Sequence, residues 1–303
     1  MKALVVGYGS IGTRHSRILK ELGCWTAVVS SRRIDFNPCY GTLDQALREE
    51  RPDYVVVANR TGEHYETVLV LARLGFRGQL LVEKPVFAQA LDFPKHSFAN
   101  VAIGYNLRFH PLLRRLKGLL ENEKVLSVQA YVGKYLPEWR EKADYRQGYS
   151  AIKSSGGGVL RDLSHELDYL NWMFGPWERV AALGGHFSGL EIDSEDIFCI
   201  LMVTKKCPVI SVQMNYVDRA AKREIVVITD AHSFRADLIS GFLETDGKRE
   251  SWKAEGDSTY RFQHEAILNR EQSAYCSLAQ GMEIMRLIEA VERASRQKVW
   301  VGR

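Results

Sequence analysis

Short apolar runs alternate with helix-like segments through the first third of the chain. The runs are rich in branched and aliphatic side chains and fall at residues 2–6, 25–30, 54–58, 79–82 and 101–105. Apolar residues at helical spacing mark the segments between them, at residues 13–22, 43–50 and 65–74. Near-continuous apolar runs are typical of parallel strands covered on both faces. The alternation predicts an α/β domain with a doubly wound parallel sheet over residues 1–115.

Beyond residue 115 the hydrophobic pattern changes. Residues 125–132 alternate in character, as a strand does when one face of its sheet meets water. Further strands are predicted at residues 180–183, 197–204, 209–216, 224–229, 232–237 and 242–245, and helices at 112–121, 159–174 and 279–295. Residues 116–303 are therefore predicted to form an α+β domain with a large, mainly antiparallel sheet.

A glycine-rich turn directly follows the first apolar run. Gly7, Gly9 and Gly12 have the spacing G-x-G-x-x-G between a predicted strand and a predicted helix, which is the context of dinucleotide-binding turns. The first glycine permits the turn, the second lets the backbone approach a pyrophosphate, and the third lets helix and strand pack. The N–H groups at the helix start, around Ser10 and Ile11, would hold the phosphates. An ordinary glycine turn is the alternative to this Rossmann cofactor domain.

The residues after the second run bear on the choice of cofactor. A carboxylate at this position binds the ribose 2′-OH of NAD, but the chain has Ser30, Ser31, Arg32 and Arg33, with no acidic residue before Asp35. Hydroxyl and guanidinium groups would instead bind a 2′-phosphate. This predicts NADP as cofactor, with NAD as the alternative if the arginines are only solvated.

Polar residues also follow the other predicted strands, at the edge where open α/β sheets bind ligands. The further candidate cofactor contacts are Asn59, Thr61, His64, Glu83, Lys84 and Asn106. Lys84 has a second possible role, because Pro85 fixes the chain beyond it, and a partly desolvated lysine beside a nicotinamide is a plausible general acid or base. A surface lysine paired with Glu83 is an equal alternative.

A second candidate constellation begins at the triple glycine 156–158. On the predicted helix that follows, Asp162, His165 and Asp168 stand three residues apart on one side. Two carboxylates beside a histidine would fix its tautomer and support its charge, which suits a proton shuttle. A structural histidine is one alternative. A metal site is the other, but the segment has a single histidine and no H-E-x-x-H, so no metal is predicted.

Composition excludes several classes of partner. The 303 residues are 46% hydrophobic and 26% charged, with a net charge of +4 and no dense block of Lys or Arg. We therefore expect no nucleic-acid or membrane partner. Five widely spaced cysteines argue against a disulfide framework, and the short first apolar run argues against a signal peptide. The expected location is the cytoplasm.

The four motifs together resemble the Gfo/Idh/MocA oxidoreductases. They are residues 7–12, Glu83-Lys84-Pro85, residues 105–111 and residues 156–168. The resemblance implies that Lys84, His165 and a nearby aspartate act at the hydroxyl or carbonyl carbon that carries the hydride. Asp162 is three residues from His165 where the family often has four, so Asp168 is the alternative partner. The resemblance also implies a homodimer or homotetramer formed through the C-terminal sheet.

Residues 133–155 are rich in aromatic and basic side chains and are the expected specificity segment. Aromatic faces suit sugar rings, and basic groups suit a phosphate or carboxylate. The candidate substrate contacts are Lys84, Arg108, Tyr135, Trp139, Arg140, Tyr149, Lys153 and His165. The predicted function is an NADP(H)-dependent dehydrogenase or reductase acting on a sugar or sugar derivative, anionic or nucleotide-linked. The rival functions are a non-catalytic NADP-binding sensor of the same fold and a reductase of imines or non-sugar carbonyls.

Overall fold

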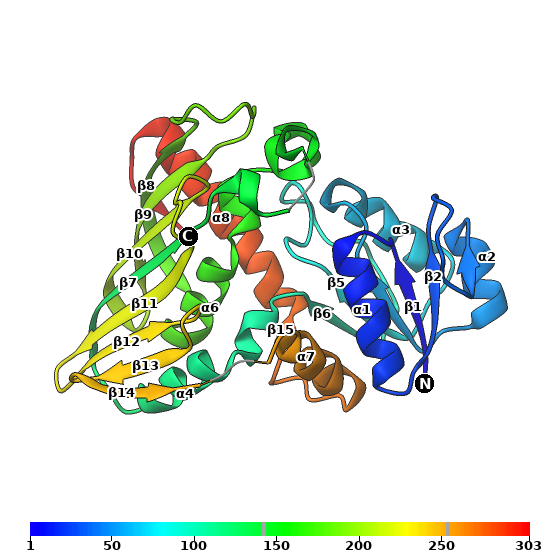
Figure 1. Cartoon of the computed structure of the whole chain (residues 1–303), viewed down its shortest axis with the longest axis horizontal. Helices are drawn as coiled ribbons and strands as arrows, with labels where there is room; N and C mark the ends of the chain where they lie inside the picture. Colours follow the sequence, from blue (N-terminus) through cyan, green and yellow to red (C-terminus); the bar gives the residue numbers. More distant parts are fainter. Residues whose placement is uncertain (141–143, 253–254) are drawn as a thin grey trace. The chain divides into compact units, whose positions relative to one another are not determined.

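The computed structural model describes residues 1–140, 144–252 and 255–303. The chain forms two compact units, each built around its own sheet (Figure 1). The first unit comprises Met1–Phe109 and Asp257–Met282, and the second comprises His110–Gly256 and Glu283–Arg303. The first unit is therefore made from two separate stretches of sequence. The predicted division into a cofactor domain over residues 1–115 and a second domain over residues 116–303 stays a prediction.

The first unit contains a seven-stranded sheet with the order β15-β6-β5-β4-β1-β2-β3. Its strands are β1 (Lys2–Val6), β2 (Trp25–Val29), β3 (Cys39–Tyr40), β4 (Tyr54–Val57), β5 (Gln79–Val82), β6 (Asn100–Ile103) and β15 (Cys276–Ser277). All pairs are parallel except β15 with β6. From β1 the chain adds β2 and β3 on one side of the sheet and then β4, β5 and β6 on the other side. This order confirms the predicted doubly wound sheet.

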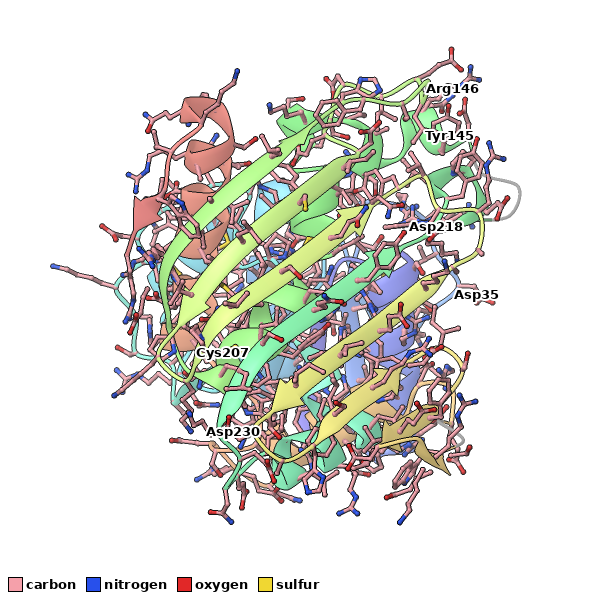
Figure 2. The ribbon with its side chains drawn as sticks, turned by 90° about the vertical axis from the view of Figure 1, so that its left-hand side faces the viewer. Asp35, Tyr145, Arg146, Cys207, Asp218 and Asp230 are labelled. Carbon is pink, nitrogen blue, oxygen red and sulfur yellow. The ribbon has the colours of Figure 1, made fainter. Side chains whose placement is uncertain are left out.

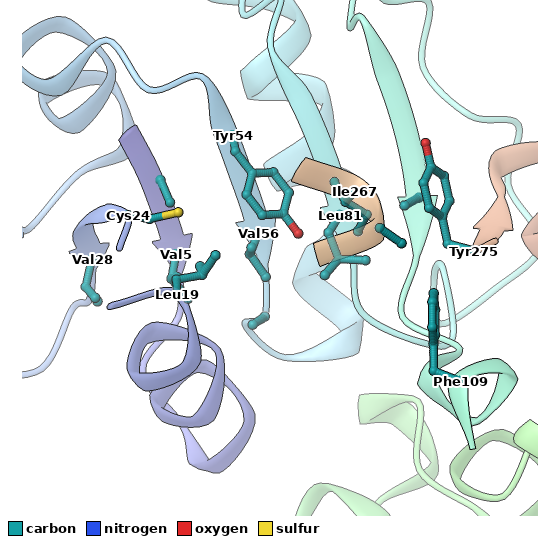
Figure 3. Close-up of a cluster of buried hydrophobic side chains, with 14 residues drawn as sticks. Val5, Leu19, Cys24, Val28, Tyr54, Val56, Leu81, Phe109, Ile267 and Tyr275 are labelled. Atoms are coloured by element: carbon teal, nitrogen blue, oxygen red, sulfur yellow. The ribbon is translucent and has the colours of Figure 1, made fainter. Parts of the chain in front are cut away.

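Helices accompany this sheet, and one of them was not predicted from the sequence. The helices are α1 (Ser10–Glu21), α2 (Leu43–Glu50), α3 (His64–Arg73) and α7 (Ser258–Leu268), with short 3₁₀ turns η1 (Thr61–Glu63) and η2 (Asn106–Phe109). Figure 3 shows Ile267 of α7 and Tyr275 in the same buried cluster as Val5, Val56 and Leu81 from the strands. Residues 257–282, which we call the returning segment, thus complete the core of the first unit.

The second unit contains a nine-stranded sheet with the order β14-β13-β12-β11-β7-β10-β9-β8-β16. Its strands are β7 (Val125–Gly133), β8 (Trp177–Gly185), β9 (Ile197–Thr204), β10 (Cys207–Asn215), β11 (Lys222–Thr229), β12 (Ser233–Asp237), β13 (Phe242–Thr245), β14 (Lys248–Ser251) and β16 (Val301–Gly302). Among the described strands of this sheet, only β7 and β10 pair in parallel. The prediction of a large, mainly antiparallel sheet is confirmed.

The helices of the second unit are α4 (Pro111–Leu119), α5 (Val159–Asp162), α6 (His165–Phe174) and most of α8 (Leu278–Gln297), which begins in the first unit. Residues 133–155 form successive 3₁₀ turns: η3 (Leu136–Glu138), η4 (Tyr145–Gln147), η5 (Tyr149–Ala151) and η6 (Lys153–Ser155). Residues 141–143 of this segment lie outside the described residues. No helix in the described part of the chain is long and apolar enough to span a membrane.

One face of the second sheet packs against helices, and the other carries exposed side chains (Figure 2). Ile200 and Val212 point to the packed face and are fully buried. On the open face Leu201 lies opposite Ala181, and Leu183 lies opposite Cys199. Leu183 and Leu201 are 67% and 47% exposed, so this part of the open face is apolar.

Candidate active site

The glycine turn after β1 requires glycine at two of its positions. Gly7 has φ +97°, and a Cβ there would lie 2.6 Å from the Asn59 backbone. A Cβ on Gly12 would lie 2.0 Å from the Gly7 carbonyl oxygen. Both approaches are closer than any side chain tolerates, so these glycines serve the packing of the turn.

Gly9 differs, because a Cβ there would meet no described atom within 4 Å. Gly9 is the N-cap residue of α1, and in the described part of the chain no side chain caps this helix or places an acid in its first turn. Gly9 and Ser10 are exposed. The helix start therefore presents N–H groups and its positive dipole end to open space, which fits the pyrophosphate of a dinucleotide.

Arg32 is held beside the glycine turn. Its guanidinium donates a hydrogen bond to the Tyr8 carbonyl oxygen at 2.7 Å, and its backbone N–H donates to the Ser30 hydroxyl at 3.1 Å. Ser31 and Arg33 are exposed in the same loop. The loop therefore places one guanidinium next to the turn and leaves two further polar side chains accessible.

Hydrogen bonds and buried side chains stabilise the turn after β4. The Asn59 amide donates to the Thr67 hydroxyl at 2.9 Å, and Thr61 is buried in η1. His64 is 1% exposed, and its ring nitrogens lie 3.2 and 3.3 Å from the backbone carbonyl oxygens of Val86 and Asn59. Burial lowers the pKa of His64, so the ring is neutral at pH 7. The predicted cofactor contacts of Asn59, Thr61 and His64 stay predictions.

Glu83 and Lys84 follow β5 at the same edge of the sheet. The Glu83 carboxylate is 7% exposed; its Oε1 lies 2.9 Å from His15 Nε2, and its Oε2 accepts from the Lys84 N–H at 3.2 Å. Burial opposes ionisation of Glu83, but the His15 hydrogen bond and the charge on Lys84 outweigh it, so the pKa is lowered. Lys84 is half-buried. Sequence reasoning missed His15, although it follows Gly12 by three residues on α1.

Asn106 and Arg108 are buried in η2 and take partners from the returning segment. The Asn106 amide donates to the Thr259 hydroxyl at 2.7 Å. The Arg108 guanidinium donates to Gln280 Oε1 at 2.8 Å. Thr259 and Gln280 lie more than 150 residues away in sequence, so no local pattern pointed to them.

The predicted continuous helix over residues 159–174 is wrong. The helix breaks at Leu163, where φ is −99° and ψ is 21°, so Asp162 ends α5 and His165 begins α6. The Asp162 carboxylate accepts hydrogen bonds from the Tyr149 and Tyr216 hydroxyls, both at 2.6 Å. These two charge-assisted bonds offset the helical hydrogen bonds lost at the break. Asp162, His165 and Asp168 therefore do not share one helix face.

Burial, and then the charge of Asp162, raise the pKa of Tyr149 and of Tyr216 well above 10.0. Both phenols therefore remain donors at every physiological pH. His165 and Asp168 are buried, at 8% and 1% exposure. Which of Asp162 and Asp168 supports His165 stays a prediction.

Residues 133–155, the expected specificity segment, line a half-open pocket of about 370 Å³. Of the candidate substrate residues, Trp139 and Arg140 line it, together with Tyr145 and Ser150. Tyr135, Tyr149 and Lys153 are not among its described lining residues: Tyr135 lies 3.7 Å below the Arg219 guanidinium, Tyr149 binds Asp162, and Lys153 is exposed. The segment therefore brings together only part of the predicted set. The described residues contain no cluster of His, Cys, Asp or Glu able to hold a metal ion.

Comparison with known proteins gives the same fold across the whole chain. Levoglucosan dehydrogenase in complex with NADH matches with a TM-score of 0.84 and 14% identity, covering 100% of this chain and 98% of that one. The WlbA dehydrogenase from Bordetella pertussis, in complex with NADH and UDP-GlcNAcA, matches with a TM-score of 0.80 and 18% identity, covering 100% and 98%. These similarities concern the fold.

Sequence comparison identifies the family. The Bacillus subtilis (strain 168) protein named "Putative oxidoreductase YteT" is 23% identical over 140 residues, which span 44% of this chain and 32% of that relative. The chain thus matches only about a third of this curated relative's length. The model of the oxidoreductase family with an NAD-binding Rossmann fold matches residues 1–97, and that of the GFO/IDH/MocA C-terminal domain matches residues 113–235. Because the two models together cover most of the sequence, the chain belongs to the GFO/IDH/MocA family of oxidoreductases.

Proposed function

We propose that the protein is an NADP(H)-dependent dehydrogenase or reductase of a sugar or sugar derivative, anionic or nucleotide-linked. The hydride would move to or from a hydroxyl or carbonyl carbon. The observation that carries this proposal lies within the first unit. An uncapped helix start at Gly9 and a half-buried Lys84 beside a buried carboxylate lie at the same edge of one parallel sheet. Ligands bind at this edge in open α/β sheets.

The residues of the glycine turn would hold the cofactor. Gly9, Ser10, Ile11 and Gly12 offer backbone N–H groups to the pyrophosphate. Arg32, with Ser30, Ser31 and Arg33, would bind the 2′-phosphate of NADP, because a guanidinium recognises phosphate with two parallel hydrogen bonds. When bound, the nicotinamide cofactor supplies or accepts the hydride. Since the two similar structures described above hold NADH, the choice of NADP rests on this loop alone.

The chain's own side chains would handle the proton. Lys84 would donate a hydrogen bond, and then a proton, to the reacting oxygen of a carbonyl substrate, and would accept the proton in the reverse direction. The Glu83 carboxylate would support the positive charge of Lys84. His165 would bind and polarise a substrate oxygen, with Asp162 or Asp168 supporting its charge.

The pocket in the specificity segment supports a sugar-like substrate. Trp139 offers an aromatic face and Arg140 an exposed positive charge. Aromatic faces pack against the apolar faces of sugar rings, and guanidinium binds carboxylate or phosphate. Levoglucosan and UDP-GlcNAcA, the ligand of WlbA, define a starting panel of neutral and nucleotide-linked sugars.

The decisive experiment follows reduced-nicotinamide absorbance with this panel in both directions. We expect Lys84→Met to lower kcat by about 10²- to 10⁴-fold, the usual contribution of a general acid, while NADPH still binds. Arg32→Ala should weaken NADPH binding more than NADH binding. Surface Arg48→Ala is the matched control. NADPH binding without turnover of any panel member, in either wild type or Lys84→Met, would instead indicate the sensor.

We further propose a homodimer or homotetramer formed through the open face of the second sheet. Exposed apolar side chains there include Leu183 and Leu201. Burying such a face is favourable by about 25 cal/mol per Å² of apolar area. Leu201→Lys should lower the mass measured by light scattering after gel filtration, and an unchanged mass would place the contact elsewhere.

A further inference from the structure

A chain of hydrogen bonds runs through the interior of the first unit behind Lys84. The Tyr54 Oη lies 3.0 Å from His264 Nδ1, His264 Nε2 lies 2.8 Å from His15 Nδ1, and His15 Nε2 lies 2.9 Å from Glu83 Oε1. We call these four side chains the histidine chain. Tyr54, His264 and His15 are 0% exposed and Glu83 is 7% exposed. The four come from β4, α7, α1 and the end of β5.

The direction of these hydrogen bonds follows from counting protons. An ionised carboxylate only accepts, so His15 donates from Nε2 to Glu83. A neutral His15 then accepts at Nδ1, which requires His264 to donate from Nε2. His264 therefore accepts at Nδ1 from the Tyr54 hydroxyl. Every proton and every ring lone pair of the histidine chain is used in this arrangement.

One added proton reverses two of these bonds. A doubly protonated His15 would donate to His264, and His264 would donate to Tyr54, whose own hydroxyl proton would then lose its acceptor in the chain. Burial, and then any positive charge on His15, lower the pKa of His264 well below 6.5. The interior therefore favours a neutral His264, and the negative charge of the histidine chain lies on Glu83.

Gly104 limits the space behind this charge. A Cβ on Gly104 would lie 2.8 Å from Glu83 Oε1 and 3.0 Å from its Oε2. The carboxylate is thus confined between the Gly104 backbone and His15, with its second oxygen on the Lys84 N–H at 3.2 Å. The charge beside Lys84 is fixed in place.

We propose that Tyr54, His264 and His15 are positioning residues that hold Glu83 ionised and stationary, so that Lys84 keeps its proton until the substrate oxygen takes it. This inference rests on the proposed function of Lys84. The histidine chain itself conducts no proton, because it ends at the fully buried Tyr54.

Other titratable groups also act on Glu83, and two of them, His64 and Tyr260, stay in place in the variants below. The groups that face it are His15 from α1, Tyr54 from β4, His64 from α3, Tyr260 from α7 and the adjacent Lys84. His64 is neutral, and burial raises the pKa of Tyr260 to about 12, so neither changes charge near pH 7. Lys84 and the histidine chain are therefore the groups whose protonation the test follows.

The first test needs no substrate. Nitrogen-15 spectra of the full-length protein labelled at histidine report the protonation of each ring nitrogen. We expect His15 and His264 to be neutral and protonated at Nε2 at pH 7. Doubly protonated His15, or His264 protonated at Nδ1, would overturn the proposed direction. Because the spectra need no turnover, this result stands even if the protein proves to be a sensor.

The second test compares His15→Leu with His15→Gln. Leucine leaves Oε1 of buried Glu83 without its donor, so the carboxylate takes up a proton and Lys84 loses its support. We expect kcat to fall more than tenfold, and the alkaline limb of the rate profile to move to lower pH. Glutamine places an N–H near the Nε2 position and should restore most of both. Exposed His232→Gln is the control.

Tyr54→Phe removes only one hydroxyl and keeps the inference testable if His15→Leu fails to fold. We expect kcat to fall about threefold, with the alkaline limb moved in the same direction and the KM for NADPH unchanged. A folded His15→Leu or Tyr54→Phe variant with the wild-type rate profile would overturn the inference. Turnover that is insensitive to Lys84→Met would overturn the proposed function instead.

Discussion

Each unit contains a buried carboxylate at its candidate site, and the two are held by different chemistry. Glu83 is held by an imidazole whose other nitrogen binds a second imidazole. Asp162 is held by two phenol hydroxyls at 2.6 Å. An imidazole changes charge near neutral pH, whereas the pKa of Tyr149 and that of Tyr216 are raised well above 10.0. The surroundings of Glu83 can therefore take up protons in acid, while those of Asp162 keep their protons at every physiological pH.

The different hydrogen-bond partners of Glu83 and Asp162 suit these carboxylates to different roles. A carboxylate between two phenols has partners that keep their protons and a fixed position, which suits structural support. A carboxylate at the end of the histidine chain is coupled to the protonation of its neighbours, which suits a group beside a proton donor. Three measurements of stability test this contrast.

The largest expected effect is at Asp162. Asp162→Ala removes two charge-assisted hydrogen bonds, each contributing about 1.5–3 kcal/mol, so the free energy of unfolding should fall by about 3–6 kcal/mol. Urea unfolding followed by circular dichroism measures the loss. Asp162→Asn, which keeps the shape and one acceptor oxygen, should lose less. Equal stability of Asp162→Ala and wild type would show that the two phenols do not depend on this charge.

The next effect is at Glu83, where pH enters. Because folding lowers the pKa of Glu83 below 4.5, its charge stabilises the fold above pH 4.5, and this contribution is lost as pH falls further. Glu83→Gln should therefore cost about 1–3 kcal/mol at pH 7, with the cost shrinking below pH 4.5. Urea unfolding at several pH values measures it. A cost that is constant with pH would contradict the lowered pKa.

The smallest effect is at Tyr54. Its hydroxyl donates a neutral hydrogen bond to His264, so Tyr54→Phe should cost about 0.5–1.5 kcal/mol in thermal or urea unfolding. Folding also depresses the pKa of His264, which makes stability fall as pH drops below 6.5. That slope should persist in Tyr54→Phe, since burial of the ring is its main cause. A loss as large as that of Asp162→Ala would remove the contrast between neutral and charged partners.

Features fixed by short stretches of backbone could be predicted from the sequence. Glycine is required at positions 7 and 12, because a Cβ at either position would lie within 3 Å of backbone atoms. Their spacing, between a predicted strand and a predicted helix, identified the turn. The apolar run 54–57 is buried along its whole length, as a central parallel strand must be. Alternation over 125–132 likewise identified a strand with one exposed face.

Features that depend on distant partners could not be predicted. Helical spacing over 159–174 gave no sign of the break at Leu163, because the bonds from Tyr149 and Tyr216 to Asp162 come from a 3₁₀ turn and the end of a strand. His15 was missed for the same reason, since its partner His264 is 249 residues away. The sequence identified residue types suited to catalysis, but not the contacts that hold them.

The return of residues 257–282 to the first unit has a consequence for genetic engineering. A fragment that ends near residue 115 would lack His264. It would also lack Ala266 and Ile267 of α7, which lie in the same buried cluster as Val5 and Val56. Exchanging the cofactor module between homologues therefore requires transplanting two non-adjacent pieces of coding sequence together. Deletions that remove residues 257–282 should likewise destabilise the first unit, although its glycine turn lies far earlier in the sequence.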